Sequence, residues 1–342
     1  MHFKTSIEPY TLQFKKPAGT SRGVYQIHKV WFVRIFDPDD VHHLGVGECA
    51  PLPDLSCDAL PTPDYESILL QACRDLELSG RIDDEALRPY PSILFGLETA
   101  VRHFERGSYA LWDTPFSRGE KGIPINGLIW MGEYRQMAEQ IEEKLRLGFT
   151  CIKLKIGAIN FEEELDLLKR IRQRFTPEMI TLRVDANGGF TPEEAPSKLQ
   201  RLSELNLHSI EQPIRAGQRQ EMAGLTATTP LPIALDEELI GCNSYAEKRR
   251  LLQDIKPQFI ILKPSLHGGF SGCTEWIELA ESLHIGWWIT SALESNVGLN
   301  AIAQWVATLG NPMPQGLGTG LLYTNNIEMP LHLEGEYLWY KP

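Results

Sequence analysis

From about residue 121 onward, short apolar runs alternate along the chain with amphipathic stretches of helical spacing. The apolar runs end near eight positions that lie 25–30 residues apart: Gly127, Lys155, Asp185, Glu211, Asp236, Lys263, Ser291 and Gly316. Eight β units at a nearly constant interval, with helices between them, are typical of a parallel (β/α) barrel. A doubly wound open sheet is the alternative, but it rarely contains so many regular units. We therefore predict an α/β fold with a TIM-like barrel over residues 121–320.

The first 120 residues have a different pattern. Strand-like segments are found at 10–14, 30–36 and 45–48, and helix-like segments at 64–78 and 92–106. These segments predict an α+β domain over residues 1–120, and the Gly- and Lys-containing stretch 116–122 marks its boundary. The tail, residues 321–342, is strand-like again, and we expect it to leave the barrel and return to the first domain.

Composition excludes several classes of protein. The 342 residues carry 33 Lys and Arg against 45 Asp and Glu, a net charge of −12. This excess of acidic residues argues against a nucleic-acid-binding protein, because nucleic-acid surfaces need clustered Lys and Arg. The chain has no apolar run of the roughly 18 residues that a membrane span requires. The N-terminal segment lacks the apolar core of a signal peptide, and the six cysteines form no CxxC motif. We expect a cytoplasmic protein with reduced thiols that binds neither nucleic acid nor membrane; no pattern specifies an oligomeric state.

Two lysines share one face of a predicted strand. In the segment 151–156, Lys153 and Lys155 alternate with aliphatic residues, so both point the same way. In a barrel strand the apolar set faces the helices, and the lysines therefore point inward. Two neighbouring ammonium groups repel each other, which lowers the pKa of at least one and suits it to act as a base. A solvated charge pair is the other interpretation.

Three carboxylates end three consecutive predicted strands, at Asp185, Glu211 and Asp236. Barrel active sites are built at these strand ends, and a hard cation such as Mg²⁺ relieves the repulsion among converging carboxylates. Any one of them could instead be a helix N-cap, but three in a row are harder to explain in that way. We assign Asp236 to the metal because it continues the inward alternation from Ala234. Its neighbour Glu237 is then expected to point toward an adjacent strand or helix.

Further polar residues surround this predicted centre. Lys263 ends the sixth strand, so lysines flank the carboxylates on both sides. Small polar groups after the seventh strand could hold a substrate carboxylate, although a plain polar turn explains Ser291 equally well. The candidate substrate-binding residues are Ser291, Asn187, Glu294, Ser295 and Arg22. Arg22 lies in the loop GTSRG, where a solvated arginine is the alternative.

At these residues the chain resembles the enolase superfamily, and within it the muconate lactonizing enzyme-like subgroup. The resemblance rests on Lys-x-Lys on the second strand, acids on the third to fifth and Lys on the sixth. It implies an α+β capping domain, completed by the C-terminal tail, and a modified (β/α)₇β barrel. The stretch GVGECAPLPDLS, residues 45–56, resembles the capping loop that closes over substrate. The segments INGLIW, SALESNVGLNA and QGLGTG are most similar to the o-succinylbenzoate synthases of menaquinone biosynthesis.

The resemblance also implies a reaction and its cofactor. The superfamily removes a proton α to a carboxylate, with Mg²⁺, or Mn²⁺ as a substitute, stabilising the enediolate. In the o-succinylbenzoate synthases the substrate is 2-succinyl-6-hydroxy-2,4-cyclohexadiene-1-carboxylate, and loss of water makes its ring aromatic. Lys155 would be the base and then the acid, and Lys263 would stabilise the enolate. Lys153 would neutralise carboxylate charge and depress the pKa of Lys155.

Alternatives within the superfamily keep the chemistry and change the substrate. An N-acylamino-acid racemase or a dipeptide epimerase would use both lysines as a two-base pair. Dipeptide epimerases of the subgroup carry Asp-x-Asp on the eighth strand, where this chain reads PQGLGTGLL without an acid. A muconate cycloisomerase has less local similarity in its favour. A non-catalytic barrel scaffold would be expected to lack at least one of the six residues, and all six are present.

Overall fold

The barrel is the larger part of a computed structural model that describes residues 3–20, 23–157 and 159–342. Within these residues, seven parallel strands pair in the spatial order β11-β10-β9-β8-β7-β6-β5. They are β5 (Gly127–Ile129), β6 (Cys151–Lys155), β7 (Thr181–Asp185), β8 (Ser209–Glu211), β9 (Ile233–Leu235), β10 (Phe259–Leu262) and β11 (Gly286–Ile289).

Residues 315–316 close this sheet into a barrel. Gly316 forms a parallel bridge with Thr290, just after β11, and Gln315 forms one with Ile125, just before β5. The backbone N–H of Gly316 donates to Ile289 and that of Asn126 donates to Gln315, at 2.8 and 3.0 Å. The eighth strand position is thus occupied by a short segment, and the predicted barrel is confirmed.

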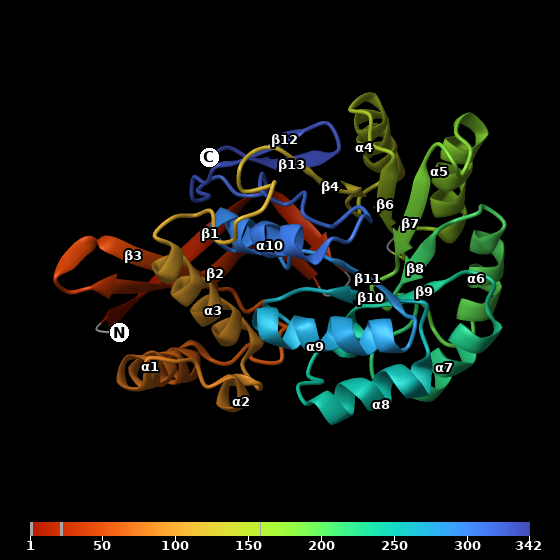
Figure 1. The fold of residues 1–342 in the computed structure, drawn as a ribbon. Helices are drawn as coiled ribbons and strands as arrows, with labels where there is room; N and C mark the ends of the chain where they lie inside the picture. The colour runs from red at the N-terminus through yellow and green to blue at the C-terminus, as the bar shows by residue number, and fades with distance from the viewer. Residues whose placement is uncertain (1–2, 21–22, 158) are drawn as a thin grey trace.

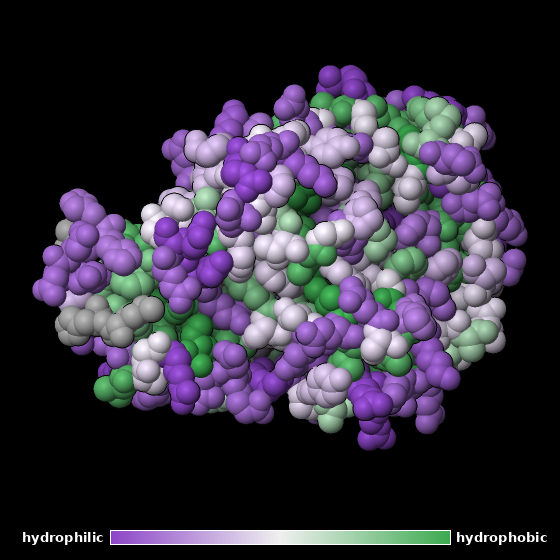
Figure 2. All heavy atoms as spheres, in the orientation of Figure 1, coloured by the Kyte–Doolittle hydropathy of each residue, from purple (hydrophilic) through white to green (hydrophobic). Residues whose placement is uncertain are grey.

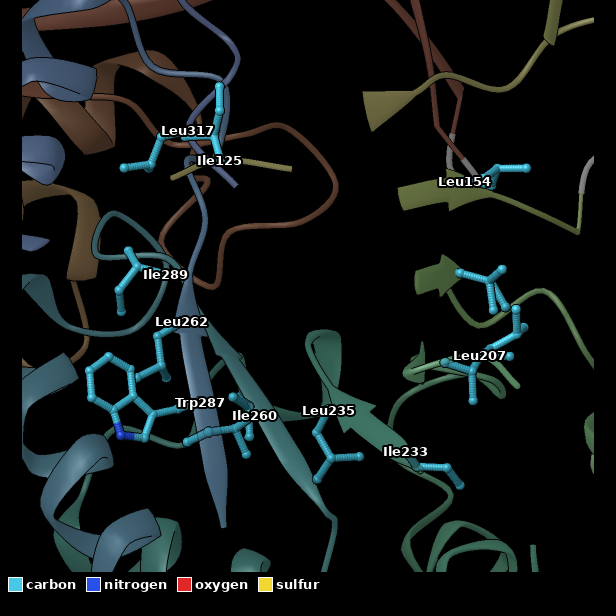
Figure 3. Packing of buried hydrophobic residues seen from close by; sticks show 14 of the residues in the cluster. Ile125, Leu154, Leu207, Ile233, Leu235, Ile260, Leu262, Trp287, Ile289 and Leu317 are labelled. Atoms are coloured by element: carbon cyan, nitrogen blue, oxygen red, sulfur yellow. The ribbon is translucent and has the colours of Figure 1, made fainter. Parts of the chain in front are cut away.

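Helices cover the outside of the barrel (Figure 1). They are α4 (Tyr134–Arg146), α5 (Phe161–Arg174), α6 (Ala195–Ser203), α7 (Arg219–Thr228), α8 (Tyr245–Ile255), α9 (Gly269–Ser282) and α10 (Asn296–Leu309), with a 3₁₀ turn η1 (Glu237–Leu239) after β9. The main core lies between these helices and the outward faces of the strands, where Ile152 and Leu154 of β6 are fully buried. Figure 3 shows side chains of this cluster along β9, β10 and β11. Alternation therefore leaves the inward face of each strand for other side chains.

The N-terminal part forms a separate layer beside the barrel, on the left of Figure 1. Its elements are the antiparallel strands β1 (Lys4–Thr20), β2 (Gly23–Asp37) and β3 (Asp40–Cys49), and the helices α1 (Thr62–Ser79), α2 (Asp84–Leu87) and α3 (Pro91–Arg106). A second core joins Val33 and Ile35 of β2 to Leu69 and Leu97 of the helices. Strand β3 lies so close to α3 that a Cβ atom on Gly47 would come within 1.8 Å of a backbone oxygen. Only glycine fits there.

The C-terminal tail contacts both parts. Residues 322–324 hydrogen-bond to β1, through Lys15 N–H to Leu322 and Thr324 N–H to Gln13. The hairpin β12 (Leu331–Glu334) and β13 (Tyr337–Tyr340) then pairs with β4 (Ile123–Pro124), at the entry to the barrel. The tail thus leaves the barrel as expected, yet its hairpin pairs beside the barrel. The division at residues 1–120, 121–320 and 321–342 stays a prediction.

Apolar side chains are concentrated in these cores. On the face in Figure 2, hydrophilic residues form most of the rim and apolar atoms lie in scattered patches between them. Among the described residues, no helix is both long and apolar enough to span a bilayer. The six cysteines are all free thiols.

Candidate active site

A cavity of about 110 Å³ lies at the carboxyl ends of the barrel strands. Barrel strands supply its charged wall, and the segment after the closing strand position supplies Gly318 and Thr319. Tyr25, Leu52 and Leu55 of the N-terminal part cover it from the other side. The predicted site residues in its wall are Lys153, Lys155, Asp185, Asn187, Glu211, Lys263 and Ser291. The fold therefore gathers residues from five predicted strands into one enclosed space.

The two lysines of β6 point into this cavity, as their alternation predicted. Lys153 Nζ lies 3.0 Å from Asp185 Oδ2 and donates a hydrogen bond to Glu211 Oε2. Lys155 Nζ lies 3.2 Å from the same Asp185 oxygen and donates to Asn187 Oδ1 at 2.8 Å. Lys155 is also 5.8 Å from the centre of the Trp130 ring. Each ammonium group is thus held by fixed neighbours.

Lys153 is not a lysine whose pKa is lowered. Burial alone lowers the pKa of its ammonium group, but the charges of Asp185 and Glu211 outweigh that effect and raise the pKa above its ordinary value. The repulsion between two ammonium groups is therefore weaker than the attraction of the carboxylates around them.

The three carboxylates are buried side by side. Asp185 and Glu211 end neighbouring strands β7 and β8, in register with each other, and Asp236 directly follows β9. Despite burial, Lys153 and Lys155 hold the pKa of Asp185 below its ordinary value. Burial and the nearby Asp185 charge raise the pKa of Glu211. Lys263 likewise holds the pKa of Asp236 below its ordinary value, so Glu211 is the carboxylate of the three whose charge the lysines compensate least.

Two unpaired carboxylate oxygens favour a divalent cation at this donor set. Glu211 Oε1 and Asp236 Oδ1 are buried and have no hydrogen-bond partner among the described residues. Carboxylate oxygens are the ligands that hard cations prefer. Across residues 3–20, 23–157 and 159–342, no three Asp, Glu, His or Cys side chains form a ready-made metal site, and Lys153 contacts both Asp185 and Glu211.

Lys263 contacts this cluster from the side opposite the lysines of β6. Its Nζ donates to Asp236 Oδ2 at 2.5 Å. Strands β7, β8 and β9 lie between β6 and β10 in the sheet. The distance from β6 to β10 is therefore four strand positions, half of an eight-position barrel. Lys155 and Lys263 therefore stand on opposite sides of the cavity, as the strand order predicted.

Glu237 corrects one expectation. It was expected to point toward a neighbouring strand or helix, but its side chain lines the cavity and accepts a hydrogen bond from Asn187 Nδ2 at 3.1 Å. Strand β9 ends at Leu235, and the chain enters η1, so strand alternation no longer sets the direction of the next side chains. Burial, together with Asp236, raises the pKa of Glu237 to about 7. Asp236 remains the residue paired with Lys263.

The substrate-contact candidates divide into three groups. Asn187 and Ser291 line the cavity, and Ser291 Oγ hydrogen-bonds with Thr319 Oγ1 at 2.6 Å. Glu294 and Ser295 do not belong to its wall. Glu294 accepts from Ser265 Oγ and from Ala292 N–H, and Ser295 is the N-cap of α10, so both serve structural hydrogen bonds. Arg22 lies outside the described residues.

Several lining residues were not identified from the sequence as candidates. Trp130 follows β5 and forms an aromatic wall near Lys155, while Leu293 adds to the apolar side. A tryptophan directly after a predicted barrel strand, in NGLIW, is a signal that could have found Trp130. Leu52 and Leu55 lie in the stretch 45–56 that resembles a capping loop, but composition alone does not select them.

Comparison with known proteins agrees with this geometry. A family model described as enolase C-terminal domain-like matches residues 136–338. The chain is 48% identical over 361 residues to the o-succinylbenzoate synthase of Desulfotalea psychrophila, covering 96% of each protein. It is 26% identical over 309 residues to the D-Ala-D/L-Ala epimerase of Cytophaga hutchinsonii, covering 87% of this chain and 82% of that protein.

A solved structure supports the same relationship. The crystal structure of MenC from Desulfotalea psychrophila superposes with a TM-score of 0.83 at 43% identity, covering 99% of this chain and 100% of that one. The resemblance to the enolase superfamily is therefore confirmed over nearly the full length, and this chain belongs to the enolase C-terminal domain-like family.

Proposed function

We propose that this protein is an o-succinylbenzoate synthase, a hydro-lyase that dehydrates 2-succinyl-6-hydroxy-2,4-cyclohexadiene-1-carboxylate to o-succinylbenzoate. The observation that carries this proposal is the 48% identity to a protein of that name over 96% of both chains. The strand order supports it, because Asp185, Glu211 and Asp236 lie at the ends of the three strands between those that carry Lys155 and Lys263.

The elimination needs one group that first takes and then returns a proton. In its neutral form, Lys155 Nζ removes the α-proton of the substrate carboxylate and the C–H electron pair moves into the carboxylate. The same ammonium group then protonates the leaving hydroxyl on the same face, the C–O bond breaks and water departs. Lys155 is well placed for this exchange because Asp185 and Asn187 fix its nitrogen. Aromatisation of the ring makes the second step strongly favourable.

The remaining charged residues stabilise the negative charge that builds on the substrate. Lys263, on the opposite side, supplies positive charge without having to move a proton. Lys153 compensates the negative charges of Asp185 and Glu211, which its ammonium group contacts directly. Trp130, Leu52 and Leu55 give the cavity an apolar side that suits a six-membered carbon ring.

We propose Mg²⁺ as the cofactor, held by Asp185, Glu211 and Asp236. When bound, such an ion offsets the second negative charge that develops on the substrate carboxylate. The unpaired Glu211 Oε1 and Asp236 Oδ1 are the oxygens that support this assignment. Since Lys153 contacts two of the three acids, we expect its ammonium group to shift when the cation binds.

We propose menaquinone biosynthesis as the pathway and the cytoplasm as the location. The six cysteines are free thiols, as is usual in the reducing cytoplasm.

Racemisation of N-acylamino acids is the second candidate, because the lysines on opposite sides of the cavity also suit a two-base exchange. Dipeptide epimerisation has less support, since residues 314–322 provide no acid for a peptide amine. Turnover of the cyclohexadiene substrate, measured beside an N-succinylamino acid at the same Mg²⁺ concentration, tests the proposal. We expect dehydration to have the higher kcat/KM. Racemisation without detectable dehydration would move the function to the second candidate.

A further inference from the structure

The backbone of Lys263 is held on both sides by the turn that follows β10. Lys263 is the first residue after the strand, where the parallel ladder ends. Its N–H donates to Nδ1 of His267 at 2.8 Å. Its C=O accepts from the N–H groups of Leu266 and His267, at 2.8 and 3.0 Å. One side chain, that of His267, therefore replaces the partner that the sheet no longer provides.

The imidazole of His267 is buried and neutral. Only 2% of the residue is exposed, and burial lowers the pKa of its imidazole to about 3. Because Nδ1 accepts the Lys263 N–H, the ring proton is on Nε2. Nε2 has no hydrogen-bond partner among the described residues. A buried N–H of this kind requires an acceptor nearby.

A cavity of about 70 Å³, lined mostly by charged and polar residues, lies beside His267, between α2 and α3 on one side and α8 and α9 on the other. A water molecule needs only about 10–15 Å³ of such space, so the cavity has room for several. Its cations, Arg88 and Lys248, already pair with Glu275 at 2.8 Å. The cavity walls are thus charge-balanced, and water suits the space better than an anion does.

The far end of the same turn is anchored by the N-terminal part. Glu98 of α3 accepts from the N–H groups of Phe270 and Ser271, at 2.5 and 3.0 Å, and so caps the first turn of α9. A Cβ on Gly269 would lie 2.2 Å from Glu98 Oε2, so this approach requires glycine. The turn therefore has little freedom to move, provided that His267 holds its first residue.

We propose that His267 is a positioning residue for Lys263, and that water in the adjacent cavity accepts the hydrogen bond from its Nε2. The hydrogen bond fixes the peptide from which the Lys263 side chain extends toward Asp236 and the substrate cavity. This inference rests on the proposed function, in which Lys263 stabilises the developing enolate. Misplacing such a charge by about 1 Å is expected to reduce the rate more than the binding of substrate.

Three variants separate this role from simple packing. His267→Asn keeps an acceptor at the position of Nδ1, His267→Gln places its amide at the position of Nε2, and His267→Leu has no acceptor. We expect kcat to fall about 10- to 100-fold in the Leu and Gln variants, with KM changed less than about threefold. The Asn variant should recover most of the wild-type kcat. The Gln variant keeps the test valid if the Leu variant does not fold.

His103 provides a matched control. It is another buried histidine whose Nδ1 accepts a backbone N–H, from Val46 at 3.0 Å, but it lies in the N-terminal part. His103→Leu should lower the melting temperature and leave the kcat of the folded enzyme unchanged. An equal loss of kcat in both histidine-to-leucine variants would overturn the positioning role.

Hydrogen–deuterium exchange at Lys263 gives a readout that does not depend on activity. The peptide containing Lys263 should exchange faster in His267→Leu than in the wild type or in His267→Asn. If the wild type fails to dehydrate the substrate but exchange still responds in this way, the proposed function fails and the positioning of the backbone stands. Wild-type kcat together with wild-type exchange in His267→Leu would overturn the inference.

Discussion

Glu48 and Ser295 are 247 positions apart in the chain, yet two hydrogen bonds join them in the interior of the molecule. The Glu48 carboxylate accepts from the backbone N–H of Ser295 at 2.8 Å and from its hydroxyl at 2.5 Å. A third donor, the N–H of Gly298, lies 2.8 Å away. Since Ser295 is the N-cap of α10, the carboxylate also meets the positive end of that helix. Strand β3 is thereby fastened to a helix of the barrel.

Replacing Glu48 by alanine should therefore destabilise the protein substantially. The change leaves two backbone N–H groups and a hydroxyl buried without an acceptor, and each such group costs about 1–3 kcal/mol. Glu8→Ala is the control, because its pair with Arg34 lies on the surface and contributes about 0–1 kcal/mol. Urea unfolding of the two variants measures the difference. Equal midpoints would contradict the assigned role of Glu48.

The second prediction compares two glycines with nearly the same φ angle. Gly269 and Gly80 have φ of +67° and +69°, so alanine at either site costs roughly 1–2 kcal/mol of left-handed strain. A Cβ at Gly80 meets nothing within 4 Å, whereas one at Gly269 comes within 2.2 Å of Glu98 Oε2. Gly269→Ala should therefore lower the free energy of unfolding more than Gly80→Ala does. Thermal unfolding of both variants tests this. An equal loss of unfolding free energy in the two variants would show that the Glu98 side chain moves aside without destabilising the protein.

The parts of the site that follow from local pattern could be predicted from the sequence. Lys153 and Lys155 belong to a regular strand, so period-two alternation alone places both in the barrel interior. Asp185 and Glu211 each end a strand, and parallel strands end at one face of a barrel. Their convergence needs only the strand order, which the regular spacing of the units supplies.

Other positions depend on contacts that no local pattern specifies. Glu237 lies in a 3₁₀ turn, where alternation has ended, and its side chain turned toward the cavity instead of away from it. Glu294 and Ser295 looked like substrate contacts because they follow a strand. Ser295 instead hydrogen-bonds to Glu48, and no local sequence pattern predicts that Glu48 lies beside α10. The apolar cover from Leu52 and Leu55 likewise depends on how the N-terminal part packs on the barrel.

The third prediction concerns the metal. Asp185→Asn should weaken Mg²⁺ binding at least about 100-fold, because loss of even an outer-sphere partner commonly costs about 10- to 100-fold. Titration calorimetry with Mg²⁺ measures the affinity directly, and Asp75→Asn, an exposed acid on α1, is the control. Activity should disappear with EDTA and return with Mg²⁺ in the wild type. Unchanged Mg²⁺ affinity in Asp185→Asn would remove this residue from the metal site.

The last prediction separates the roles of the two opposing lysines. Lys155 takes and returns a proton, whereas Lys263 contributes charge, so both alanine variants should lose dehydration for different reasons. For Lys155→Ala we expect a loss of at least about 10²–10⁴-fold in kcat, the usual contribution of general acid–base catalysis, because this lysine serves twice. Lys263→Arg keeps a positive charge and should retain more activity than Lys263→Ala. Lys155→Arg should be as inactive as Lys155→Ala, because guanidinium does not give up its proton at neutral pH.

Exchange in D₂O with a carboxylate analogue that cannot eliminate water completes the distinction. Wild type and Lys263→Arg should exchange the α-proton on the face toward Lys155, and Lys155→Arg should not. Because the lysines stand half a barrel apart, any exchange on the opposite face reports on Lys263 alone. Dehydration that persists in Lys155→Ala would overturn its assignment as the base. Rapid exchange on both faces in the wild type, together with racemisation of N-succinylamino acids, would instead show that both lysines act as bases, since electrostatic stabilisation by Lys263 removes no proton.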